Sequence, residues 1–226
     1  MTQKRCFDKK YIYRVVGILL FALLVFLFLW RNQDKEAKQY QMVFLGDSVV
    51  GNVPGGQSMT EVMEQRLGKT VFNGAFGGTS MSLINEDLRG SKASSQWSMV
   101  ELARAICYED WGSQRASLAY AKHYQKTNTQ MLDYFPDRLL ELSQIDFDGV
   151  EILLIEHGTN DYGGGQILEN PEDVYDVETF GGALRTILSM LQEKWPKLRI
   201  VLVTPIYCEL GENGSKKCYN TDYGGG

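Results

Sequence analysis

The sequence predicts a layered α/β fold around a mostly parallel sheet. Four short apolar runs, rich in β-branched residues and bounded by Gly, Asp or Pro, are typical of buried strands. They lie at residues 42–45, 70–72, 150–155 and 200–203. Helical patterns separate them, and strands that alternate with helices usually form a parallel sheet covered by helices.

Helix signals fill the intervals between these runs. Ser58 and Glu61 have the spacing of a capping box, which predicts a helix ending near Gly68. A long amphipathic stretch at 177–195 stops at Pro196. Several helices are expected in 80–142, one with Met99, Leu102, Ala103 and Ile106 on one face and another with Met131, Leu132, Phe135, Leu139 and Leu142.

Length, composition and charge indicate one globular domain with an N-terminal addition. The chain has 226 residues, of which 44% are hydrophobic, enough to bury one core. Its 28 acidic and 23 basic residues give a net charge of −5, without a basic run in the globular part. Nucleic acid is therefore not an expected partner.

The addition is an apolar stretch from Tyr11 to Trp30. About twenty residues at 1.5 Å each match the thickness of a bilayer core, and a small-residue cleavage site does not follow the stretch. We therefore expect a cytoplasmic tail at 1–10, a transmembrane anchor at 11–30, a linker at 31–40 and an extracytoplasmic domain at 41–226. The orientation follows from the basic residues on either side, Lys4, Arg5, Lys9, Lys10 and Arg14 before the stretch and Arg31, Lys35 and Lys38 after it. The alternative, a buried core helix, is rarely apolar all round.

The four cysteines do not have the spacing of a zinc site. Cys6 lies in the predicted cytoplasmic tail, and Cys107 falls in a helical pattern. Cys208 and Cys218 flank a polar loop and would close it as a disulfide in an oxidising compartment. Neither a metal nor a cofactor is expected.

Three predicted strands end in glycine and small polar residues. The first ends in Gly46-Asp47-Ser48, the second in residues 73–79 and the third in Gly158-Thr159-Asn160-Asp161. Parallel strands direct their carboxyl ends to one edge, where ligands of such sheets bind. Ser48 would bring a hydroxyl there and Asn160 an amide, which are parts of an acyl-transfer site. The alternative is that these residues only form tight turns.

In this order the motifs resemble those of the SGNH or GDSL hydrolases. The resemblance rests on FLGDS at 44–48, NGAFGGTS at 73–80 and EHGTND at 156–161. It implies a flavodoxin-like three-layer α/β/α sandwich that hydrolyses or transfers O-acyl groups. Ser48 would be the nucleophile, and an oxyanion hole would comprise the N–H groups of Ser48 and Gly78 and the side chain of Asn160. Gly77 is the alternative to Gly78, and supporting roles would go to Asp47, Gly158 and Asp161.

Other hydrolase and nucleotide-binding patterns fit less well. Ser48 is followed by Val49-Val50-Gly51, one residue too long for the Gly-x-Ser-x-Gly elbow of α/β-hydrolases. Gly-x-Gly-x-x-Gly does not follow any predicted strand, and a P-loop motif is absent from the sequence. A site for a nucleotide phosphate is therefore not expected.

One departure from the family concerns the general base. These enzymes carry a downstream Asp-x-x-His, whereas the histidines of this chain are His123 and His157. We therefore expect the hydrolase domain to be C-terminally incomplete and this chain alone to be nearly inactive. The predicted function is that of a membrane-anchored extracytoplasmic serine esterase that hydrolyses or transfers O-acyl groups. Acylated cell-envelope carbohydrate is the candidate substrate. The alternative is a surface module that binds an acylated or sugar ligand without catalysis.

Overall fold

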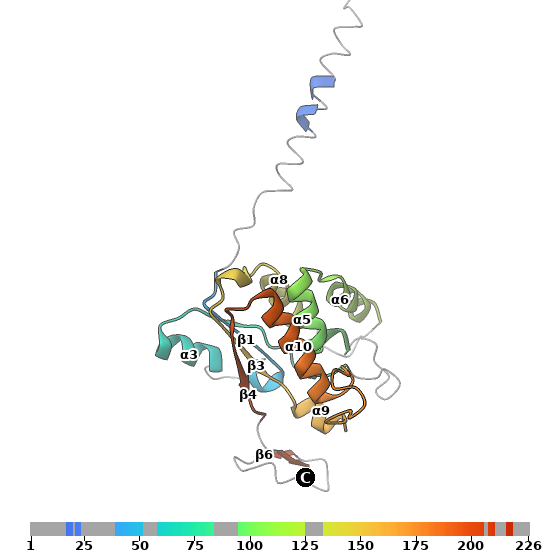
Figure 1. Ribbon diagram of the computed structural model, residues 1–226. Coiled ribbons are helices and arrows are strands. Elements are labelled where there is room, and N and C mark those ends of the chain that lie inside the picture. Colours follow the sequence, from blue (N-terminus) through green and yellow to red (C-terminus); the bar gives the residue numbers. More distant parts are fainter. Residues whose placement is uncertain are drawn as a thin grey trace, which may run out of the picture. The chain divides into compact units, whose positions relative to one another are not determined.

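The computed structural model describes residues 17–19, 21–23, 39–51, 58–83, 95–124, 133–205, 208–210 and 216–218. The chain separates into two units, Met1–Ala37 and Lys38–Gly226. The second unit contains a parallel sheet and the helices that pack on it (Figure 1).

The sheet has four parallel strands. They are β1 (Met42–Gly46), β2 (Val71–Asn73), β3 (Ile152–Glu156) and β4 (Arg199–Val203), in the order β2-β1-β3-β4. Met42 of β1 lies opposite Val71 and Ile152, and Ile152 in turn lies opposite Arg199. The mixed α/β architecture and the parallel sheet predicted from the sequence are confirmed.

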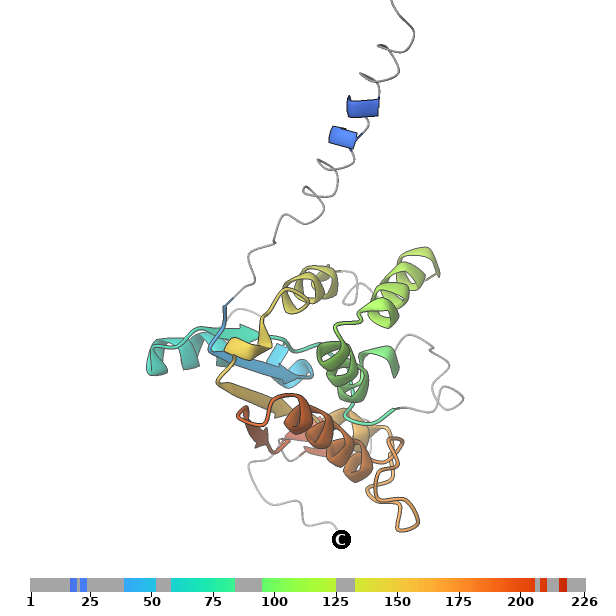
Figure 2. The same cartoon turned by 45° about the horizontal axis from the view of Figure 1, so that its top comes forward.

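Helices α5 (Met99–Tyr108), α8 (Phe135–Leu142) and α10 (Phe180–Lys194) cover one face of the sheet (Figure 2). Strand residues that point to this face, such as Val43, Leu45, Leu153 and Ile155, share the main core with buried residues of the three helices. Helix α6 (Gly112–Tyr124) and the short 3-10 helix η1 (Ser95–Trp97) extend this layer, and η2 (Phe147–Gly149) precedes β3. Burial of these apolar faces is the main stabilising contribution.

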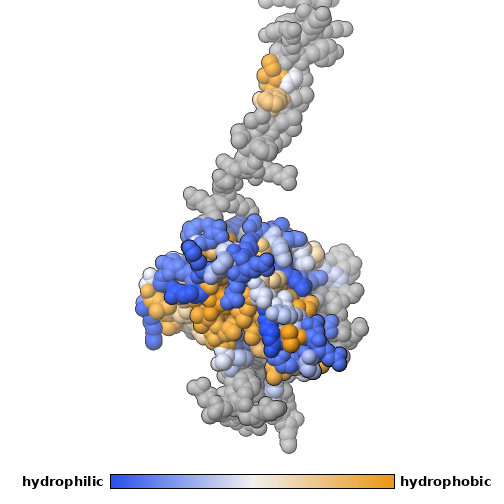
Figure 3. All heavy atoms as spheres, in the orientation of Figure 1, coloured by the Kyte–Doolittle hydropathy of each residue, from blue (hydrophilic) through white to orange (hydrophobic). Residues whose placement is uncertain are grey.

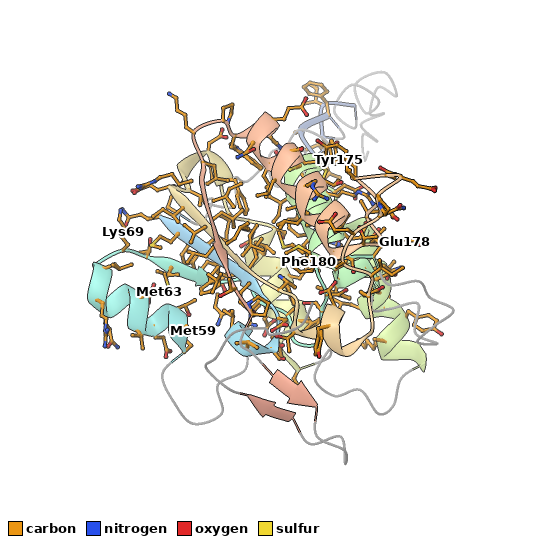
Figure 4. All side chains as sticks on the ribbon, turned by 60° about the horizontal axis from the view of Figure 1, so that its bottom comes forward. Met59, Met63, Lys69, Tyr175, Glu178 and Phe180 are labelled. Atoms are coloured by element: carbon orange, nitrogen blue, oxygen red, sulfur yellow. The ribbon has the colours of Figure 1, made fainter. Side chains whose placement is uncertain are left out.

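Fewer of the described helices lie on the other face. Helices α2 (Ser48–Gly51) and α3 (Met59–Leu67) pack on it through Val50 and Met63; Figure 4 labels Met59 and Met63 on α3. On the edge strand β4, Val201 is 43% exposed and Leu202 47% exposed, and Figure 3 shows apolar atoms gathered over this strand. The described helices thus form layers on both sides of the sheet, but the layer of α2 and α3 leaves β4 exposed.

The predicted helix ends agree with the structure at α3 and differ at α10. Ser58 caps α3 in a capping box with Glu61, and Gly68 ends it in the left-handed conformation with a φ of 64°. Helix α10 begins at Phe180 rather than at residue 177, because the Thr179 side chain accepts a hydrogen bond from the Gly182 N–H and fixes the start there.

The apolar helix faces in the interval 80–142 are confirmed where they are described. In α5 the predicted face Met99, Leu102, Ala103 and Ile106 is buried. In α8 Phe135, Leu139 and Leu142 are buried, whereas Met131 and Leu132 lie outside the described residues.

Most of the predicted anchor, residues 11–30, also lies outside the described residues. Its described parts, 17–19 and 21–23, are helical, and Ile18, Leu19, Phe21 and Leu23 expose most of their surface. Within the ranges that the structure describes, a helix long and apolar enough to cross a bilayer is not found.

Strands β5 (Cys208–Leu210) and β6 (Lys216–Cys218) form a separate antiparallel pair. Its register places Cys208 opposite Cys218, the two cysteines that flank the polar loop. Cys107 is a free, buried thiol whose pKa is raised by burial. Cys6 lies outside the described residues.

Candidate functional site

The first strand end turns directly into a short helix. Ser48 is the first residue of α2 and is partly exposed, whereas Asp47 before it is fully buried. The Asp47 Oδ1 atom accepts a hydrogen bond from the Val49 N–H at 2.8 Å, which satisfies one of the free donors at the start of α2. A Cβ at Gly46 would lie 2.7 Å from the Val50 side chain, so glycine permits this turn.

The segment after the second strand continues to bond with the first. The N–H groups of Gly74 and Phe76 donate to the carbonyls of Phe44 and Gly46 at 2.9 and 2.8 Å. The N–H of Gly77 donates to the Tyr134 hydroxyl at 2.8 Å, while Gly78 has a φ of 78°. The two glycines left open by the sequence therefore differ, because Tyr134 occupies the N–H of Gly77.

Glycine is also required at the third strand end. Gly158 has a φ of 134° and precedes α9 (Thr159–Gly163). An added Cβ would lie 2.7 Å from the Pro205 side chain and 3.2 Å from the Phe180 ring, which Figure 4 labels. Both the backbone conformation and the space exclude a side chain here.

Asn160 joins the three strand ends. Its Nδ2 donates to Asp47 Oδ2 at 2.9 Å and to the Thr79 carbonyl at 2.7 Å. The structure therefore uses both hydrogens of this amide, one toward the first strand end and one toward the second. In Figure 1, α9 lies beside the short blue helix α2 at the lower ends of the strands.

Asp161 holds the second strand end against the third. It is buried, and it accepts hydrogen bonds from the N–H groups of Met81 at 2.8 Å and Ser82 at 3.0 Å. The Ser82 hydroxyl donates to the same carboxylate at 2.5 Å. These three hydrogen bonds to one buried carboxylate connect segments that are about eighty residues apart in the sequence. Hydrogen bonds to an ionised acceptor are among the stronger ones.

His157 faces Thr79. Its Nε2 lies 3.2 Å from the Thr79 hydroxyl, and burial lowers the pKa of the imidazole to about 3, so the ring is neutral. His123 belongs to α6, and its side chain lies outside the description. In the described part of the chain, the Ser48 hydroxyl has neither an imidazole nor another hydrogen-bond partner.

Glu156 is a site residue for which the sequence predicted no role. It is the last residue of β3, lies opposite Gly46 and is 1% exposed. Burial, followed by the charge of Asp47, raises the pKa of its carboxyl to about 8. The sequence feature that could have indicated this role is an acidic residue directly after an apolar run predicted to be buried.

A hollow of about 560 Å³ lies at the opposite end of the sheet. Its lining comes from residues 147–151 and 194–199, next to the N-terminal ends of β3 and β4. It contains charged side chains but neither Ser, Cys nor His, so the strand-end cluster is the better candidate site. Among the described residues, a group of three or more His, Cys, Asp or Glu side chains suited to a metal is not found.

Comparison with known proteins does not establish a family. The chain does not match a family model or a curated protein. A crystal structure of a Lactobacillus plantarum protein is similar with a TM-score of 0.43 and 16% identity, covering 76% of this chain and 59% of that one. A second crystal structure has a TM-score of 0.46 and 18% identity, covering 80% of this chain and 69% of the other. This chain thus spans less than two thirds of the first protein, and at these scores neither similarity carries an argument.

Proposed function

We propose that this chain is a serine ester hydrolase of the SGNH or GDSL type. The supporting observation is that Asn160 bonds to Asp47 and to Thr79, which come from the other two strand-end motifs. Tight turns alone would not require a contact between three separate strand ends. The strand order β2-β1-β3-β4 fits the flavodoxin-like arrangement, in which ligands bind at the carboxyl edge of the sheet.

In this proposal the Ser48 hydroxyl attacks the carbonyl carbon of an ester. The new C–O bond gives a tetrahedral oxyanion, and the alcohol leaves as the carbonyl re-forms, with the serine proton passing through a base to the alcohol oxygen. Water then attacks the acyl group on Ser48 in the same way, which releases the carboxylic acid and returns the proton to the Ser48 oxygen. The N–H groups of Ser48 and Gly78 and the Asn160 amide stabilise the oxyanion. Gly78 is preferred to Gly77 because the Gly77 N–H already donates to Tyr134.

The Asn160 amide can serve in this role only by sharing a hydrogen. Its two hydrogens point to Asp47 and to the Thr79 carbonyl. A shared, three-centre hydrogen bond to the oxyanion satisfies this requirement without moving the residue. None of the described residues that contact Ser48 is the general base of this proposal.

The proposed location is the outer face of a membrane, with an N-terminal anchor at 11–30. The exposed apolar residues Ile18 and Phe21 of the described helical turns support an apolar environment for this segment. An outward-facing domain of this kind would act on O-acyl groups of extracellular or cell-envelope carbohydrate.

Labelling with a fluorophosphonate tests the nucleophile. We expect the full chain to be labelled at Ser48, and added imidazole to accelerate labelling because it supplies a base. Ser48→Ala should abolish labelling, whereas Ser113→Ala, which changes an exposed serine of α6, should leave it intact. Unchanged labelling of Ser48→Ala, or absence of labelling with imidazole present, would overturn the proposal.

A non-catalytic module that binds an acylated or sugar ligand is the second candidate. The observation in its favour is that the described contacts of Ser48 lack an imidazole, while both hydrogens of the Asn160 amide are already bonded. Binding of acetylated oligosaccharide without phosphonylation of Ser48 would support this candidate.

A further inference from the structure

Two buried acidic residues lie at the ends of the neighbouring strands β1 and β3, at the carboxyl edge of the sheet. Gly46 of β1 is the backbone partner of Glu156 of β3, and Asp47 follows Gly46 directly. Asp47 is 0% exposed and Glu156 is 1% exposed. The two acidic residues therefore share an environment from which water is excluded.

Their hydrogen bonds differ. Asp47 accepts from the Val49 N–H and from the Asn160 amide. By contrast, neither oxygen of Glu156 has a hydrogen bond of ordinary geometry within the described residues, and the backbone N–H of Asp47 is the weakest of the influences on its pKa. Two ionised carboxylates in this position would repel each other, and the Glu156 carboxylate would lack a well-placed donor.

One proton resolves both problems. As a carboxylic acid, Glu156 can donate its O–H to the Asp47 carboxylate, and after burial and the charge of Asp47 a side-chain hydrogen bond to Asp47 is a further influence that raises its pKa. Aspartic proteases likewise share one proton between two carboxylates that cannot both ionise.

The other groups around Glu156 do not neutralise it. Its partner on β4 is the apolar Val203. From α9, Asp161 is engaged by Met81 and Ser82, and the neighbouring His157 is neutral with its Nε2 toward Thr79. Asp47 is the charged neighbour that acts on Glu156.

We propose that Glu156 is a positioning residue of this site, which as a neutral acid holds the Asp47 carboxylate in place as the acceptor for the Asn160 amide. This inference rests on the proposed function and adds a regulatory property to the same site. Loss of the proton places a second negative charge beside Asp47, which displaces the carboxylate that orients Asn160. The oxyanion hole is therefore assembled at pH values at which Glu156 is protonated, and it is disturbed at higher pH, at which Glu156 is ionised.

Two readouts on the full chain in detergent micelles test this inference. The first is the NMR signal of the Asn160 side-chain amide, assigned by its loss in Asn160→Ala, and it does not depend on catalysis. In the wild type it should shift with a midpoint near pH 8. In Glu156→Gln, whose amide donates to Asp47 at every pH, this transition should disappear. Glu172→Gln, an exposed control, should keep it.

The second readout is the rate of Ser48 phosphonylation. It should fall about tenfold between about pH 7 and pH 9 in the wild type, following the fraction of protonated Glu156. In Glu156→Gln the carboxyl pair is absent. The contribution that the pair makes to the pH dependence should therefore be lost, leaving a change of about twofold or less in the phosphonylation rate over this range.

The two readouts separate failure of this inference from failure of the proposed function. An Asn160 transition that persists in Glu156→Gln, or is absent from the wild type, would overturn the positioning role whether or not Ser48 reacts. The expected NMR transition without any phosphonylation would uphold the carboxyl pair and reject the esterase. If Glu156→Gln does not fold, the wild-type titration alone decides, because a signal constant from pH 6 to about pH 10 excludes the proton-dependent contact.

Discussion

The Nδ2 atom of Asn160 lies 2.9 Å from Asp47 Oδ2, a contact between residues 113 positions apart. It joins the turn that presents Ser48 to the N-terminal turn of α9. The geometry of the proposed nucleophile and that of the proposed oxyanion donor are therefore linked through one buried carboxylate.

Replacing Asn160 by Ala should therefore affect both stability and activity. It removes one oxyanion donor, which should lower turnover about a hundred- to a thousand-fold. It also removes a donor from buried Asp47, which should lower the free energy of unfolding by about 1–3 kcal/mol. Ester turnover in the presence of imidazole and urea unfolding measure the two effects. Full activity of Asn160→Ala would remove this residue from the proposed oxyanion hole.

Replacing Asp161 by Asn should mainly affect stability. The amide can accept at one oxygen only, whereas the carboxylate accepts from Met81 and Ser82 through both oxygens. We expect a loss of about 2–4 kcal/mol in urea unfolding, since hydrogen bonds to buried charged groups are the stronger ones. Ser82→Ala is the matched control, because it removes only the hydroxyl contact and should cost about 1 kcal/mol. Equal losses in both variants would contradict the role given to the backbone contacts.

Much of the architecture could be predicted, because local patterns determine it. Strand positions followed from short apolar runs, and the limits of α3 followed from Ser58 and Gly68. The meeting of three strand ends also followed, since parallel strands bring their carboxyl ends to one edge. The start of α10 was predicted too early, because the capping contact of Thr179 competes with an apolar pattern that continues upstream.

The contacts within the site could not be predicted in the same way. Asp161 meets Ser82 and Glu156 meets Asp47 across long sequence separations, and such pairs have no spacing rule. Likewise, the sequence leaves Gly77 and Gly78 equivalent, and only the position of the Tyr134 hydroxyl distinguishes them. Residue type indicated the chemistry, but the partner of each group depends on the folded arrangement.

Cys208 and Cys218 should form a disulfide in an oxidising compartment. They are directly opposed in the antiparallel pair β5–β6, and opposed residues of such pairs have the Cα separation that a disulfide requires. In protein whose domain has crossed the membrane, the disulfide should protect both thiols from alkylation. Cys107 should become reactive after unfolding, which differential alkylation can measure. Alkylation of Cys208 and Cys218 together with Cys107 in unfolded protein, without reduction, would show that the pair stays reduced.

The anchor prediction concerns the topology of the whole chain. If residues 11–30 span the membrane with the N-terminus inside, protease added to intact cells should degrade the domain and spare an N-terminal tag. Replacing Ile18 and Phe21 by Lys should release the protein from membranes, since charges at the centre of a span are costly. Protection of the domain in intact cells would reverse the proposed orientation.

Protein stability should have a maximum between two opposing titrations. The pKa of Glu156 is raised from 4.5 to about 8, so its contribution is complete below about pH 4.5 and is lost as the pH rises through about 8. The pKa of His157 is lowered from 6.5 to about 3, so its contribution is complete above about pH 6.5 and is lost as the pH falls toward about 3. The two slopes cancel between about pH 4.5 and pH 6.5, where we expect the highest stability.

Above this range only Glu156 contributes a slope, so the free energy of unfolding should fall by about 1 kcal/mol per pH unit up to about pH 8. Urea unfolding at half-unit steps measures this fall. Glu156→Gln removes the titrating proton while keeping the donor to Asp47, and it should abolish the alkaline fall. Glu172→Gln alters an exposed carboxyl and should leave the curve unchanged. An alkaline slope that survives in Glu156→Gln would mean that a different group holds the proton and that Glu156 is ionised in the native protein.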